Sequence, residues 1–150
     1  KAHSRFSAIS RTYKYFIATR KDPFATETSF LYTGGLAVDK MDEAAAILFD
    51  YTDFTSFSRL HTDVKTNHCQ IYEAYWSEVP GRLVFTIKAN RFLRNMVRAI
   101  VGTLIAVGRE KMTVDEFREV IECKNRSSAG PSAPAKGLFL TGIEYPDSFW

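Results

Sequence analysis

Residues 91–108 read RFLRNMVRAIVGTLIAVG, a nearly apolar segment that nevertheless carries arginines. At about 100° per residue, four of its positions fall within roughly 80° of one another on a helix: Arg91, Arg94, Arg98 and Gly102. Large apolar side chains cover most of the remaining circumference, which predicts a helix buried on most sides with one narrow cationic stripe. Gly102 continues the stripe without a side chain, so another group could approach the helix closely there.

The arginine stripe has two interpretations, a solvated helix face or a surface that meets a partner. Ordinary solvated faces also carry Glu and Lys, whereas this one carries only Arg. Arg makes bidentate contacts with carboxylates and phosphates. If the stripe has a partner, that partner is therefore expected to be nucleic-acid phosphate or a buried acid.

The length and composition exclude several classes of protein. The chain has 150 residues and a hydrophobic fraction of 45%, which suits one globular domain with a core. No apolar run reaches the roughly 18 residues of a membrane span, so we expect no membrane partner. The formal net charge of +3 is compatible with an acidic partner but does not require one. Two cysteines are too few for a disulfide scaffold, and we expect no signal peptide, a reducing compartment and a cytoplasmic location.

Aromatic and β-branched runs, turn residues and helix caps predict an ordered alternation of strands and helices. The Pro80-Gly81 pair fits a tight turn between two strands, and T-V-D-E at 113–116 is a capping box. The expected elements, in chain order, are a strand at 11–19, an irregular connection at 21–38, a helix through 41–49 capped by Asp39, strands at 69–79 and 82–89, the arginine-bearing helix between Asn90 and Gly108, a short helix from 114, a loop at 125–137 and a strand at 138–145.

The order β-α-β-β-α-(α)-β is that of a ferredoxin-like split βαβ fold. This is an α+β architecture, in which we expect an antiparallel sheet with the helices on one face. No linker is long enough to divide the chain, so residues 1–150 are expected to form one domain. Many unrelated functions share this fold, so the functional site must decide between them.

Three kinds of site find little support in the sequence. His68 and Cys69 are adjacent and would point to opposite faces of a strand, and even with His61 a fourth ligand is missing, so we expect no metal. The segment 130–137, GPSAPAKG, lacks the GK[ST] ending of a phosphate loop. Neither cysteine has a convincing base near it in the sequence that would make it a nucleophile.

Tyr13 and Tyr15 share one face of the first predicted strand. A pair of aromatic residues in a strand usually belongs to the core. Tyr13, however, is flanked by Arg11 and Lys14. Aromatic residues interleaved with cations are typical of a groove for nucleic acid, where a base stacks on the ring while the cations hold phosphate. The residues alone leave both interpretations open.

Four separated blocks of sequence resemble one enzyme family in order and spacing, and together they span nearly the whole chain. They are HSRFSAISRTYKY at 3–15, DFTSF at 53–57, KANRFLRNMVRAIVGTLIAVG at 88–108 and SAPAKGLFLTGIEYP at 132–146. The chain resembles the C-terminal part of the tRNA pseudouridine synthase A family, which isomerises uridines in the tRNA anticodon stem-loop. Four blocks are far more specific than one short motif.

The resemblance implies an isomerase that needs no cofactor and that binds tRNA as a homodimer. The family's catalytic aspartate lies in an Arg-Thr-Asp-Ala-Gly motif of an N-terminal domain. No such motif occurs in the 150 residues, and Thr62-Asp63 is not followed by Ala-Gly. We therefore expect this chain to be the C-terminal domain, to pair with its own N-terminal domain in the full-length enzyme, and to be inactive alone.

The resemblance also implies roles for individual side chains. It places the arginine that pairs with the catalytic aspartate at Arg98, the tyrosine that stacks on the target base at Tyr13, and the apolar residue that packs against the base at Leu138. Arg98 and Tyr13 are thus the expected catalytic residues. The side chains expected to contact phosphate are Arg5, Arg11, Lys14, Arg91 and Arg94.

Two rival functions make different predictions. A non-enzymatic ferredoxin-like RNA-binding module would display two or three exposed aromatics in a Gly-rich strand motif, which is absent here. A regulatory or structural domain of the same fold would show no preference for RNA.

Overall fold

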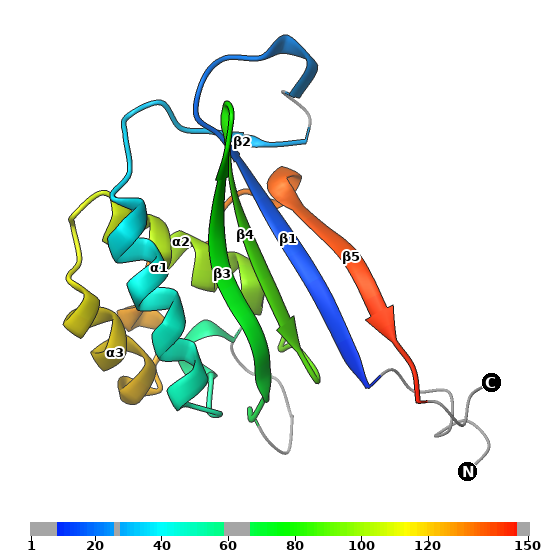
Figure 1. The fold of residues 1–150 in the computed structure, drawn as a ribbon. Helices are drawn as coiled ribbons and strands as arrows, with labels where there is room; N and C mark the ends of the chain where they lie inside the picture. Colours follow the sequence, from blue (N-terminus) through cyan, green and yellow to red (C-terminus); the bar gives the residue numbers. More distant parts are fainter. Residues whose placement is uncertain (1–8, 26–27, 59–66, 147–150) are drawn as a thin grey trace.

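In the computed structural model, which describes residues 9–25, 28–58 and 67–146, β1 (Ser10–Ala18) is the central strand of the sheet (Figure 1). β4 (Arg82–Ala89) runs antiparallel to β1, and β3 (Ile71–Val79) runs antiparallel to β4. β5 (Leu138–Glu144) pairs antiparallel with the other edge of β1. The order β5-β1-β4-β3 is that of the split βαβ unit, so the predicted α+β class is confirmed.

The connection predicted to be irregular is more ordered than expected. Its described residues contain a 3₁₀ turn, Pro23–Ala25, and a short strand, β2 (Phe30–Leu31). β2 pairs in parallel with the end of β1, with Ile17 opposite Phe30, so the sheet is mixed and not purely antiparallel. A two-residue strand is too short to show the alternation by which a strand is recognised in sequence.

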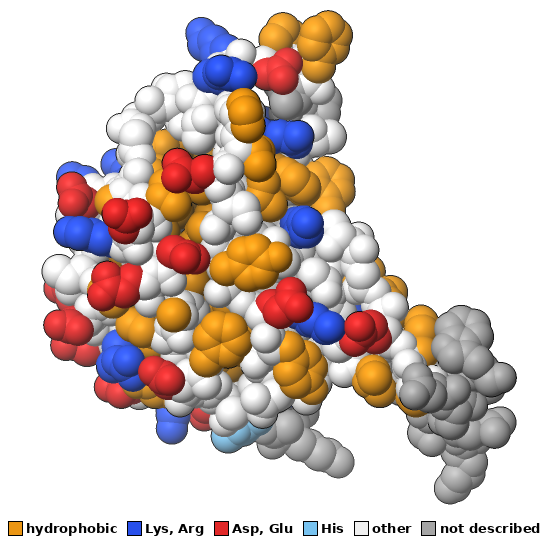
Figure 2. Space-filling view, viewed as in Figure 1, with side chains coloured by type: hydrophobic (Ala, Val, Ile, Leu, Met, Phe, Trp, Pro, Cys, Tyr) orange, Lys and Arg blue, Asp and Glu red, His pale blue; other side chains and the backbone are white. Residues whose placement is uncertain are grey.

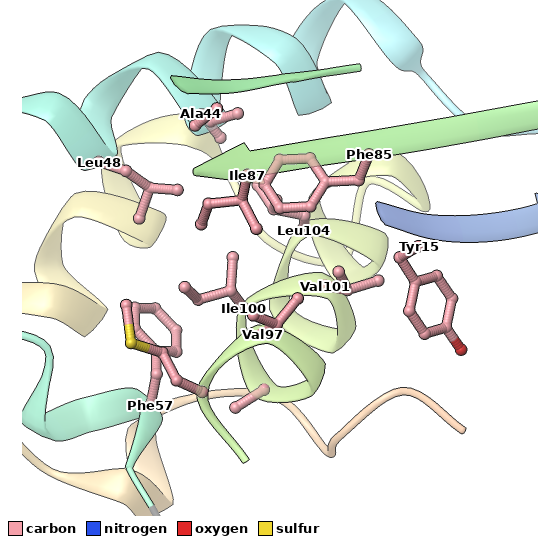
Figure 3. Close-up of a cluster of buried hydrophobic side chains, with 14 of the residues drawn as sticks. Tyr15, Ala44, Leu48, Phe57, Phe85, Ile87, Val97, Ile100, Val101 and Leu104 are labelled. Carbon is pink, nitrogen blue, oxygen red and sulfur yellow. The ribbon is translucent and has the colours of Figure 1, made fainter. Parts of the chain in front are cut away.

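Three helices cover one face of the sheet: α1 (Val38–Ile47), α2 (Met96–Gly108) and α3 (Val114–Cys123) (Figure 1). Ten of the 13 residues of α2 are buried, as expected for the central helix of the core. Figure 3 shows Phe85 and Ile87 of β4 directed toward apolar side chains of α2. Alternate residues of a strand point to opposite faces, so β4 gives this core only one of its faces.

The predicted capping box of α3 is confirmed. The Thr113 hydroxyl accepts a hydrogen bond from the Glu116 backbone N–H at 3.0 Å, and the Glu116 carboxylate accepts one from the Thr113 N–H at 2.8 Å. The tight turn between β3 and β4 is confirmed as well, with Gly81 at a φ of 76°. Both features are local, and their residue types alone determine them.

Two predicted helix caps are wrong. α1 begins at Val38, so Asp39 lies in its first turn and does not cap it. α2 begins at Met96 and not after Asn90, because the Asn90 side chain accepts a hydrogen bond from the Gln70 backbone N–H at 2.7 Å and extends the β3–β4 pairing. Arg91 and Arg94 therefore precede the helix, and the predicted stripe on the helix itself is reduced to Arg98 and Gly102.

β3 is one edge strand of the described sheet, and α1 protects part of it. The Asp42 carboxylate on α1 accepts a hydrogen bond from the Trp76 backbone N–H at 2.8 Å. An unpaired strand edge invites pairing with another chain, and occupying one of its N–H groups removes that opportunity locally. This contact also ties α1 to the sheet.

We expect Asp42→Ala to lower the free energy of unfolding by about 1 kcal/mol, because the Trp76 N–H loses its acceptor. Glu43→Ala is the matched control, since Glu43 is the neighbouring exposed carboxylate on α1. Denaturant unfolding of both variants tests this contact. Equal effects of the two substitutions would mean that the hydrogen bond contributes nothing specific.

Candidate active site

The loop before β5 lies directly on α2 at Gly102. A Cβ atom on Gly102 would lie 1.8 Å from the Pro131 carbonyl oxygen, which no side chain can tolerate. The Ala133 N–H donates to the Arg98 carbonyl oxygen at 2.9 Å. The prediction that another group approaches the helix closely at Gly102 is therefore confirmed, and that group is backbone from later in the chain.

Arg98 is held in place by the same loop. It lies in the first turn of α2, is half-buried, and donates from Nε to the Ala133 carbonyl oxygen at 2.7 Å. The two bonds between Arg98 and Ala133 fix the guanidinium plane relative to the helix. Within residues 9–25, 28–58 and 67–146, Arg98 forms no ion pair and its terminal Nη atoms donate no hydrogen bond.

Further polar contacts hold the loop on either side of this point. The Asn95 amide donates to the Ser132 hydroxyl at 2.6 Å, and Arg126 donates to the same hydroxyl at 3.1 Å. Arg126 also donates to the Gly130 carbonyl, whose own N–H donates to the Thr103 hydroxyl at 2.9 Å. The segment is consequently a fixed wall of the site, although it contains little regular structure.

Tyr15 of β1 holds the same loop from the side of the sheet. Its ring is buried, and its hydroxyl donates to the Pro134 carbonyl oxygen at 2.6 Å. Burial raises the pKa of Tyr15 to about 12, although the nearby positive charge of Arg98 acts to lower it. The phenol therefore stays protonated and continues to donate at any physiological pH.

Tyr13 and Leu138 lie on the same face of the sheet as Tyr15. Tyr13 is half-buried and packs edge-to-face on Phe92, with ring centroids 5.0 Å apart. Leu138 is the first residue of β5 and lies opposite Tyr15, while Leu140 lies opposite Tyr13. Cross-strand neighbours share a face, so Tyr13 and Leu138 border the same wall that holds Arg98.

The residues predicted to contact phosphate do not form one surface. Arg11 shares the face of Tyr13, whereas Lys14 alternates to the opposite face of the sheet. Arg94 is exposed, and Arg91 donates to the His68 carbonyl oxygen at 2.9 Å. Arg5 lies outside the described residues. Their RNA contacts remain predictions.

The polar residues that fasten the loop were not anticipated from the sequence. Asn95 lies 37 residues from Ser132 and Thr103 lies 27 residues from Gly130, so no local spacing connects these pairs, whereas Arg126 lies only four residues before Gly130. The sequence offered one hint, the residue type at position 95. The backbone there has a left-handed φ of 67°, which Asn tolerates better than most residues.

Metal binding and membrane insertion find no support in the part of the chain that the structure describes. There, no three His, Cys, Asp or Glu side chains come together in a way that could hold a metal ion. His68 pairs with the Thr52 hydroxyl at 3.0 Å, and His61 lies outside the described residues. No described helix has the length and apolar character needed to cross a bilayer.

Comparison with known proteins decides the family. A family model described as tRNA pseudouridine synthase matches residues 44–146. Proteins called tRNA pseudouridine synthase A are similar to nearly the whole chain. The one from Parabacteroides distasonis is 56% identical over 99% of the chain, and the one from Bacillus subtilis is 40% identical over 95%. The chain belongs to the tRNA pseudouridine synthase family.

The chain spans 59% of the length of the Parabacteroides relative and 56% of a Bacteroides thetaiotaomicron relative that is 55% identical. The match to the synthase family model includes Arg98, Gly102 and Leu138. Tyr13 precedes the matched segment but lies within the region shared with the Parabacteroides relative.

We expect Gly102→Ala to lower the free energy of unfolding by about 1–3 kcal/mol, the usual cost of overpacking a closely packed site. A Gly→Ala change inside a helix otherwise stabilises by roughly 0.5–1 kcal/mol, so the sign of the effect is informative. Denaturant unfolding measures it. A variant as stable as the parent chain would show that the loop is not held against Gly102.

Proposed function

We propose that this chain forms one wall of the uridine site of a tRNA pseudouridine synthase, and that Arg98 meets a catalytic carboxylate supplied by sequence outside these 150 residues. The observation that carries the proposal is the guanidinium of Arg98, anchored through Nε on Ala133 with its Nη atoms unoccupied by any described residue. An anchored Arg is preorganised to receive a carboxylate without losing much side-chain entropy.

The electrostatics favour a nucleophilic carboxylate at this point. An oxygen beside Arg keeps its charge, and the charged oxygen is the reactive form. The family resemblance implies that the carboxylate belongs to the aspartate of an Arg-Thr-Asp-Ala-Gly motif. Asp63, in the Thr62-Asp63 pair that superficially resembles that motif, lies outside the described residues.

The remaining groups suit a flipped uracil. A base removed from its stack needs an aromatic or apolar surface on which to lie, and we assign this role to Tyr13 and Leu138. The N-glycosidic bond breaks, the ring rotates, and C5 bonds to the ribose C1′. C5 must then lose its proton, and N1, which has given up its bond to C1′, gains one, so that atoms balance. Tyr13 is the group we assign to assist removal of the C5 proton. No redox cofactor is needed because the reaction is an isomerisation.

The proposal extends to the partners of the chain. The substrate is tRNA at its anticodon stem-loop, and the other wall of the site comes from the protein's own N-terminal domain. The family resemblance further implies a homodimer, and a tRNA substrate implies a cytoplasmic enzyme. The 59% coverage of the Parabacteroides relative supports a missing second domain.

We expect the 150-residue chain alone to bind tRNA weakly and to form no pseudouridine, because Arg98 and Tyr13 cannot replace a carboxylate nucleophile. Unmodified tRNA is incubated with the chain, with the full-length Parabacteroides relative as the positive control, and pseudouridine is quantified. Turnover by the chain alone would overturn the assignment of an external carboxylate and would direct attention to Asp63.

In the full-length protein, we expect Arg98→Met to lower the single-turnover rate by on the order of 100-fold or more, the scale for removing one electrostatic group from an active site. The same change should lower the free energy of unfolding of the chain by only about 1 kcal/mol, because the Ala133 carbonyl loses its donor. Affinity for tRNA should stay within a few-fold of the parent.

Arg94→Met is the matched control, since Arg94 is an exposed arginine just before α2. It should weaken tRNA binding and spare the chemical step at saturating tRNA. An Arg98→Met enzyme with a near-normal single-turnover rate would refute the role proposed for Arg98.

A further inference from the structure

A basic surface lies at the end of the sheet where β1 leads into β2, close to the start of β5. Figure 2 shows Lys and Arg side chains gathered at this upper end of the molecule. We call it the basic rim, and it consists of the exposed residues Arg20, Lys21, Arg82 and Lys136. None of these four side chains forms an ion pair within the described part of the chain.

A cavity of about 350 Å³ opens within the basic rim between Lys21 and Lys136. Its floor and walls include Ala18, Ser29 and Leu31. This volume lies in the range of sites for small molecules, so it can hold a phosphate together with the sugar attached to it.

Ser29 indicates that the cavity is suited to a polar ligand. The residue lines the cavity and is only 2% exposed, yet its hydroxyl has no hydrogen-bond partner among the described residues. A buried hydroxyl without a partner is costly, and such groups are rare in folded proteins unless something else satisfies them. A bound oxyanion between two lysines would accept a hydrogen bond from this hydroxyl.

One carboxylate also lines the cavity, that of Asp22. It accepts a hydrogen bond from the Phe24 backbone N–H at 3.0 Å and so has a structural role in the 3₁₀ turn. Lys21 and Lys136 together outweigh its charge. A second cavity of about 320 Å³ shares Asp22 and is lined by Arg20 and Arg82, which adds further positive charge to the basic rim.

The cavity is joined to the candidate active site by a short stretch of chain. Lys136 lies in the 3₁₀ turn Ala135–Gly137, directly before Leu138, which we assign to the target base. Two residues of chain span roughly 7 Å at most. A polynucleotide whose base rests on Leu138 therefore carries its neighbouring backbone past Lys136.

We propose that the cavity between Lys21 and Lys136 binds a backbone phosphate of the tRNA next to the target uridine, with the Ser29 hydroxyl as an additional donor. The inference rests on the proposed function, because it takes tRNA as the ligand. Phosphate contacts of this kind position a nucleic acid without reading its sequence. The cavity would thus set the register of the strand relative to Arg98.

The test measures binding of the chain to an unmodified tRNA transcript over a series of salt concentrations. We compare the parent with the double variant Lys21→Gln/Lys136→Gln. Each lost phosphate contact lowers the magnitude of the log–log salt slope by roughly 0.7–0.9, and because the cavity is proposed to hold one phosphate, the double variant should lose roughly that amount. Both lysines are exposed, and thermal unfolding should be unchanged.

The matched control is Lys40→Gln/Lys111→Gln, which removes the same net charge from two exposed lysines on the helical side. Its salt slope should equal that of the parent. Ser29→Ala should weaken tRNA binding without lowering thermal stability, since it removes a hydroxyl for which the described part of the unbound chain provides no hydrogen-bond partner.

The outcomes separate this inference from the proposed function. If the parent binds tRNA and both double variants lose the same slope, or neither loses any, the cavity is not a phosphate site and the proposed function stands. If the parent shows no salt-dependent binding of tRNA, both are overturned. A Ser29→Ala chain that is less stable than the parent would mean that the hydroxyl has a structural role.

Discussion

The rest of the site depends on the contact between α2 and the loop before β5. Ala133 exchanges two hydrogen bonds with Arg98, one to the helix backbone and one from the guanidinium. The exchange requires the loop backbone to approach the helix within a distance that only Gly102 permits. From this contact follow the position of Leu138 at the start of β5 and that of the Pro134 carbonyl, which receives the Tyr15 hydroxyl. Strand, helix and loop thus meet at one point, and the buried core beneath them, which Figure 3 shows, keeps that point rigid.

The hydrogen bonds between Arg98 and Ala133 also explain how the guanidinium can remain charged in a half-buried position. A half-buried Arg is costly unless hydrogen bonds compensate it. The Ala133 carbonyl accepts a hydrogen bond from Nε, and no described residue accepts one from the terminal nitrogens. Tyr15, which stays protonated because burial raises its pKa to about 12, supports the loop without competing for the Arg98 charge. The Arg98 guanidinium is therefore fixed through Nε, while its terminal nitrogens have no partner among the described residues. This arrangement suits a family whose relatives are longer than this chain, and it gives the proposed aspartate a fixed partner.

Local signals in the sequence predicted much of the fold. The bounds of β4, the capping box at Thr113 and the close approach at Gly102 each depend on the chemistry of a few adjacent residues, and each is confirmed. The errors arose where tertiary contacts override local preference. Asn90 has a suitable side chain for a helix cap, but it bonds to the neighbouring strand. The family resemblance singled out Arg98, whose catalytic role stays a prediction, but it did not indicate the anchor on Ala133, because 35 residues separate the two.

Amide hydrogen exchange of Ala133 tests the central claim most directly. Ala133 has no place in a helix or strand, and its neighbours Ser132 and Pro134 are at least partly exposed, so by sequence its amide should exchange like that of any loop residue. If its N–H is held by the Arg98 carbonyl on a buried helix, it should exchange within about tenfold of the slowest amides of β4, since both would open only with the core. Exchange at the rate of an exposed loop amide would contradict the account, because Arg98 would then have no fixed anchor.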